Sequence, residues 1–75
     1  MKSKLSELLP GDQFRRPEFG NKVYTMLSIN PTYDIVENGY NGTDPIGLKY
    51  NYAYFGENYI LCVETDDVEV EFILD

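Results

Sequence analysis

The chain has 75 residues and a formal net charge of −7, from 13 acidic and 6 basic side chains. A chain of this length forms a single domain, residues 1–75, and buries roughly 60% of its unfolded surface. Its apolar fraction of 43%, with seven tyrosines and four phenylalanines, is enough for a compact core and argues against a disordered chain.

Several kinds of chemistry are disfavoured by composition. The chain has no histidine and one cysteine, which removes the commonest general base and argues against zinc and iron–sulfur sites. Cys62 lies in an apolar run, where we expect a buried thiol rather than a nucleophile. No phosphate-binding, dinucleotide-binding or calcium-binding motif is present. We therefore expect a non-enzymatic protein without a cofactor or metal.

The cysteine count and the apolar pattern also bear on location. A single cysteine allows no internal disulfide, which fits a reducing compartment. No segment approaches the roughly 18 apolar residues that span a bilayer, and no export signal is visible. We expect a cytoplasmic protein that does not contact a membrane.

The first half of the chain predicts a helical turn followed by two strands. Leucines in residues 5–9 form the apolar side of the turn, which Pro10 and Gly11 end. A strand is expected at residues 13–16 with Phe14 inward, then a hairpin loop over residues 17–21. Residues 22–29 alternate and predict a second strand. The side chains expected on one of its faces are Val23, Thr25, Leu27 and Ile29.

The second half predicts up to four further strands. Residues 33–37 favour a short strand and residues 38–47 the longest loop. Residues 48–55 alternate, so their leucine and tyrosines share a face. Residues 59–63 are apolar throughout, which is typical of a central strand, and residues 68–74 alternate again.

Five or six short antiparallel strands must curl or close to bury one face and protect their edges. We predict a mainly β fold in one of two forms. The first is a small antiparallel SH3-like barrel, and the second is a curled five- to six-stranded meander. Both carry one short N-terminal helical turn.

The opening of the chain resembles a group of small proteins from bacteriophages and other mobile elements. The shared phrase is Leu-x-x-Leu-x-Pro-Gly-Asp-x-Phe at residues 5–14, followed by Val-Tyr-x-Met-Leu at residues 23–27. The matched positions fall within residues 5–29, about a third of the chain. The resemblance implies an SH3-like barrel and a phage accessory protein, and it implies no particular activity.

The charge of the chain is divided unevenly. Residues 1–33 carry five bases and three acids, a net of +2, whereas residues 34–75 carry one base and ten acids, a net of −9. An acidic surface repels phosphate backbones and attracts basic proteins. The candidate contact residues are Asp66, Asp67, Glu69 and Glu71. The alternative is a solvated strand face that only prevents aggregation.

A second candidate surface is aromatic. Tyr50, Tyr52 and Tyr54 share one strand face, and Tyr40 lies in the longest loop. If these rings are exposed, they anchor a protein partner or stack on a base; if they are buried, they line the core. Arg15 and Arg16 are expected to balance the acidic half within the molecule.

Three functions remain open at this point. The leading hypothesis is a phage-type protein that inhibits a host protein, such as a defence or nucleic-acid-binding protein, through a basic surface of that protein. The host protein is then the partner, with no direct nucleic-acid contact, and a homodimer is left open. The alternatives are a binder of a small-molecule or nucleotide signal and a virion assembly subunit.

Overall fold

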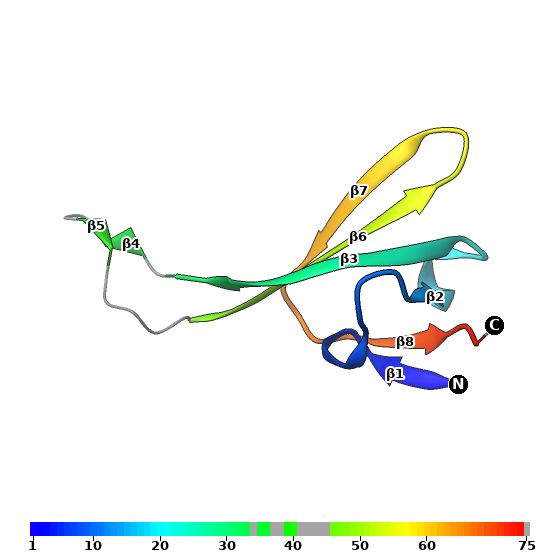
Figure 1. Ribbon diagram of the computed structural model, residues 1–75, viewed down its shortest axis with the longest axis horizontal. Helices are drawn as coiled ribbons and strands as arrows, with labels where there is room; N and C mark the ends of the chain where they lie inside the picture. The colour runs from blue at the N-terminus through cyan, green and yellow to red at the C-terminus, as the bar shows by residue number, and fades with distance from the viewer. Residues whose placement is uncertain (34, 37–38, 41–45, 75) are drawn as a thin grey trace.

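The computed structural model describes residues 1–33, 35–36, 39–40 and 46–74, with the backbone alone for residues 35, 36, 39 and 40. Within them, two 3₁₀ turns separate the first three strands, and five more strands follow (Figure 1). Their bounds are β1 (Lys2–Lys4), η1 (Leu5–Glu7), β2 (Gln13–Arg15), η2 (Pro17–Phe19), β3 (Val23–Thr32), β4 (Ile35–Val36), β5 (Gly39–Tyr40), β6 (Gly47–Phe55), β7 (Tyr59–Glu64) and β8 (Glu69–Phe72).

Six of these strands form one antiparallel sheet in the order β1-β8-β2-β3-β6-β7. The last strand, β8, lies between β1 and β2, so the sheet joins the two ends of the chain (Figure 1). The predicted mainly antiparallel β fold with a short N-terminal helical turn is confirmed. The sheet is curled but does not close into a barrel, because no pairing joins β1 to β7 among the described residues.

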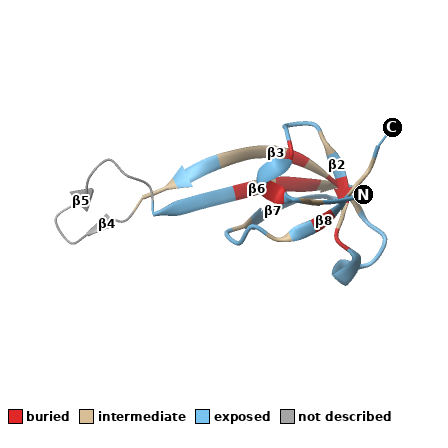
Figure 2. Ribbon diagram, turned by 90° about the horizontal axis from the view of Figure 1, so that it is seen from below, coloured by how far each residue is buried: buried red, intermediate tan, exposed pale blue. Residues whose placement is uncertain are grey.

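The buried core residues belong to β2, β3, β6 and β8 and to the N-terminal turn and the residue that follows it, and Figure 2 shows these buried positions in red. Phe14, Leu5, Met26 and Val70 are the largest side chains with almost no exposure. Aromatic rings fill much of the remaining space, and Tyr52 lies edge-on to Phe14 at a centroid distance of 5.2 Å. The predicted inward orientation of Phe14 is confirmed.

The opening turn is held against β3 by backbone hydrogen bonds. Gly11 has a φ of 94° and donates to the carbonyl of Met26 at 2.8 Å, and Met26 donates back to the carbonyl of Asp12. The Asp12 carboxylate accepts a hydrogen bond from the Leu9 amide at 2.8 Å. The proline–glycine–aspartate sequence thus serves as a turn that fixes the entry to β2, since a positive φ favours glycine.

The face assignment predicted for β3 is wrong in its second half. A register shift between Met26 and Ser28 places Ile29 opposite Tyr50, on the same face as Met26. Ile29 therefore packs against the core, whereas strict alternation placed it on the opposite face from Met26. An extra residue in one strand reverses the side-chain alternation beyond it.

The apolar run at residues 59–63 forms β7, and the prediction that this strand is central is wrong. Among the described residues it pairs only with β6, and it occupies one edge of the sheet. The exposed large apolar residues on it are Tyr59, Ile60, Leu61 and Val63. Cys62 is half-buried and packs against the core.

Beyond the core, β3 and β6 continue as a two-stranded arm that leads to β4 and β5 (Figure 1, Figure 2). The arm pairs Asn30 with Lys49 and Thr32 with Gly47. Most of the loop predicted at residues 38–47, and part of the strand predicted at residues 33–37, lie outside the described residues.

Candidate functional site

The tyrosine face predicted for β6 lies mostly inside the molecule. Tyr50 and Tyr52 are buried and Tyr54 is half-buried. Tyr52 packs edge-on against Tyr24 at 5.2 Å between ring centroids. In this conformation Tyr50 and Tyr52 line the core, which was one of the two interpretations of the pattern. The side chain of Tyr40 lies outside the described residues.

Arg16 is a buried charged residue, and it binds three neighbours. Its guanidinium donates hydrogen bonds to the Tyr52 hydroxyl at 2.7 Å and to the Glu64 carboxylate at 3.2 Å. A third bond, at 3.4 Å, reaches Glu18. Its Nε atom has no hydrogen-bond partner. The prediction that the arginines balance acids within the molecule is confirmed for Arg16, and this cluster joins β7 to η2 and β6.

The ionisation of this cluster follows from its contacts. Burial by itself lowers the pKa of Arg16, but the hydrogen bonds to Tyr52, Glu64 and Glu18 outweigh that effect and raise its pKa. The pKa of Tyr52 is raised by burial, against the opposing influence of Arg16. The pKa of Glu64 is lowered, first by the backbone amide of Asp66 and also by Arg16. The arginine is therefore a fixed cation, and this cluster holds a structural ion pair rather than a proton-transfer group.

The two glutamates of β8 lie among basic residues from the neighbouring strands. Glu71 is opposite Lys2 of β1 and Arg15 of β2, and Glu69 is opposite Lys4. Paired residues of neighbouring strands share a face of the sheet, and Lys2 lies 3.6 Å from Glu69. Three cations thus surround two carboxylates. The acidic stripe expected at residues 69–71 therefore lies among basic residues, and Glu69 forms an ion pair with Lys2.

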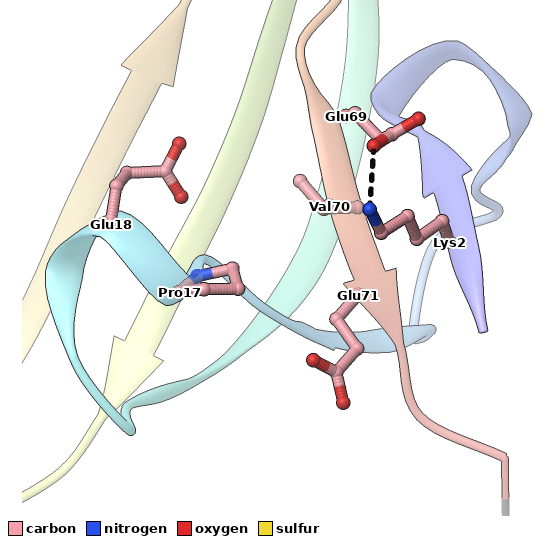
Figure 3. A pocket seen from close by; sticks show the side chains of 6 residues that line it. All are labelled: Lys2, Pro17, Glu18, Glu69, Val70 and Glu71. Atoms are coloured by element: carbon pink, nitrogen blue, oxygen red, sulfur yellow. Dashed lines mark ion pairs between the residues drawn. The ribbon is translucent and has the colours of Figure 1, made fainter.

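A shallow groove of about 280 Å³ lies beside these residues (Figure 3). Lys2 reaches Glu69, while the Glu71 side chain points away from it. The groove is lined by Lys2, Pro17, Glu18, Glu69, Val70 and Glu71. It offers three carboxylates and one ammonium group, a combination that disfavours nucleotide phosphates, and it is smaller than most ligand pockets.

A group of acidic residues that form no ion pair among the described residues lies where the turn between β7 and β8 meets η1. Asp67 accepts hydrogen bonds from the Ser6 amide at 2.9 Å and the Ser6 hydroxyl at 2.7 Å. This contact brings Glu7 and Asp66 to the same end of the sheet. Glu7, Asp66 and Asp67 are all exposed, and none of them forms an ion pair within the described part of the chain. We call these three residues the acidic end.

The predicted site residues are therefore only partly brought together. Asp66 and Asp67 belong to the acidic end, whereas Glu69 and Glu71 lie on a balanced face. Sequence reasoning missed Glu7 and the role of Glu64. No local pattern near the start of the chain indicates that Ser6 binds Asp67, because that contact joins residues 61 positions apart.

Other kinds of site receive no support from the described residues. They contain no group of three or more histidine, cysteine, aspartate or glutamate side chains arranged to hold a metal. No helix in the same ranges is long and apolar enough to cross a membrane. No family model, no curated protein and no solved structure matches this chain.

Proposed function

We propose that this is a non-enzymatic binding protein of the bacteriophage type, which inhibits a host protein by binding to a basic surface on it. The observation that supports this is the acidic end. Glu7, Asp66 and Asp67 present carboxylates that no lysine or arginine neutralises among the described residues. A net charge of −7 adds a long-range attraction toward cationic surfaces.

The positions of the charged residues restrict the proposed contact surface to the acidic end. Because Lys2, Lys4 and Arg15 lie opposite the β8 glutamates and Lys2 forms an ion pair with Glu69, we expect the β8 face to contribute less to attraction than the acidic end. The buried rings of Tyr50 and Tyr52 are structural in this conformation. The acidic end therefore replaces the wider acidic and aromatic surface as the proposed contact, with direct nucleic-acid binding disfavoured by the same carboxylates.

A capture experiment tests the proposal. The tagged protein is incubated with bacterial lysate at about 0.05 M and about 0.5 M salt, where the screening length falls from roughly 14 Å to about 4 Å. We expect basic proteins to be retained at low salt and released at high salt. Retention that does not change with salt would contradict charge-driven binding.

A pair of variants locates the contact. Asp66→Asn removes an exposed carboxylate at the acidic end, and Glu57→Gln removes an exposed one from the turn between β6 and β7. Both change the net charge by one unit. We expect Asp66→Asn to reduce capture several-fold more than Glu57→Gln. Equal effects would show that only the total charge matters and would refute the acidic end as the contact.

A further inference from the structure

The two edges of the sheet are protected very differently. The β1 edge consists of three residues, two of which are lysines, and short charged strands are a common defence against unwanted strand pairing. The β7 edge is six residues long, and its only charged residue is Glu64 at the end. Alternate N–H and C=O groups of an edge strand point away from its neighbour. The β7 edge is thus apolar, and no strand in the described ranges pairs with its outer side.

Apolar side chains occur on both faces of β7. Cys62 lies opposite Tyr52, so it and Ile60 face the core side, while Tyr59, Leu61 and Val63 face the other side. The outer row continues across the turn to Phe55, whose ring lies 5.0 Å from that of Tyr59. A strand that is apolar on both faces usually has a neighbour on each side.

We propose that the missing neighbour is a second copy of this chain, which pairs β7 with β7 in antiparallel orientation about a two-fold axis through Leu61. This register places Leu61 opposite Leu61 of the second copy, Ile60 opposite Cys62, and Tyr59 opposite Val63. Every pair is apolar, and the outer rows of the two copies form one continuous surface. The result is a twelve-stranded sheet, because each copy supplies the six strands of its own sheet.

The same register separates the negative charges near the edge. Glu64 falls opposite Asn58 of the second copy, and Glu57 falls opposite Thr65. No carboxylate between residues 57 and 65 faces another across the two-fold axis. A parallel pairing in register would instead place the two Glu64 side chains beside each other, which is destabilising.

The exposed area on this edge is near the lower limit for a stable interface. Phe55, Tyr59, Ile60, Leu61 and Val63 are between 44% and 59% exposed. At about 100 Å² each, from the 150–250 Å² of a fully exposed aromatic side chain, they offer about 500 Å² per copy. The total of about 1,000 Å² is an upper limit, because Phe55 lies on β6 and the faces of the joined sheet stay partly exposed; it corresponds at most to a weak dimer, and we expect dissociation in the micromolar range.

Disulfide trapping tests the register. In a Cys62→Ser background, Leu61→Cys places the two thiols directly opposite, with Cα atoms about 5 Å apart. Val63→Cys, on the same face, places them four residues apart along the strands, or about 14 Å. We expect Leu61→Cys to form covalent dimers at least tenfold faster. Equal rates, faster trapping at position 63, or no trapping would each overturn the proposal.

The oligomeric state supplies an independent test on the unmodified chain. Sedimentation equilibrium between about 5 and 500 μM is expected to show a monomer–dimer equilibrium, which Leu61→Lys weakens at least tenfold. Leu9→Lys, at an exposed leucine away from the edge, is expected to leave it unchanged. A monomer at all concentrations, or an equal effect of both variants, would refute the pairing.

The effect of salt concentration distinguishes the proposed dimer from the proposed binding to a basic partner. Two copies with a charge of −7 each repel one another, so screening by salt strengthens the dimer, whereas it weakens binding to a basic partner. If dimerisation weakens steeply with salt, the apolar edge is not its cause. Loss of salt-sensitive capture with an intact dimer would refute only the proposed function.

Discussion

Replacing Arg16 with methionine tests the role of the buried arginine. The substitution keeps the aliphatic volume but removes the donor to the Tyr52 hydroxyl at 2.7 Å and to Glu64 at 3.2 Å. A hydrogen bond to a charged group contributes about 1.5–3 kcal/mol. Loss of the contact with Glu18 adds less than about 1 kcal/mol to the destabilisation, because this carboxylate is about half exposed and water replaces the arginine. Removing the unpartnered Nε atom offsets part of the loss. We expect a net destabilisation of about 2 kcal/mol.

Urea unfolding followed by circular dichroism measures this loss. A domain of this length has a total stability of about 4–11 kcal/mol, and 2 kcal/mol moves the urea midpoint down by about 1–2 M. Arg15→Met is the matched control, because Arg15 lies on the other face of β2 and is only half-buried. We expect it to cost less than about 0.5 kcal/mol. A loss below 0.5 kcal/mol for Arg16→Met, or equal losses for both variants, would refute the argument.

Three further predictions concern the core, the N-terminal contact and pH. Phe14→Ala empties a fully buried site and is expected to cost about 3–5 kcal/mol, which urea unfolding followed by circular dichroism would show as the largest fall in midpoint among these variants. Asp67→Ala removes both hydrogen bonds from Ser6, and we expect a loss of about 1 kcal/mol and a melting temperature lower by about 4–8 °C in calorimetry. Because the folded pKa of Glu64 lies below its ordinary value of 4.5, its contribution is present above that pH and is lost as pH falls through the folded pKa. The stability difference between the wild type and Glu64→Gln is therefore expected to shrink from pH 7 to pH 3 in urea unfolding, and a constant difference would contradict it.

The strands with strong local patterns could be predicted from the sequence. Alternation located β6 and most of β3, and the turn at Gly11 followed from its residue types. The edge position of β7 could not be predicted, because an apolar run shows that both faces are apolar and says nothing about a neighbouring strand. β1 has no strand signal of its own. Its pairing with β8 fixes it, and sequence periodicity does not report such distant contacts.

The candidate site was harder to predict for the same reason. The acidic residues of β8 are visible in the sequence, but the placement of Lys2 and Arg15 beside them depends on the insertion of β8 between β1 and β2. Residues two positions apart on a strand share a face, so alternation places Arg16, and not Arg15, on the buried side with Phe14. The tyrosines were correctly seen as sharing a face, and only the structure shows that this face is internal for Tyr50 and Tyr52.

The position of β8 between β1 and β2 also governs how the chain folds. The β6–β7 hairpin can form early, because its contacts begin only four positions apart, between Phe55 and Tyr59. β1 has no partner until β8 is present, and the Ser6–Asp67 contact closes a loop of 61 positions. During synthesis, β1 must therefore wait for β8 before it can pair. We expect slow, cooperative folding in the range of milliseconds to seconds, as for other β domains rich in distant contacts.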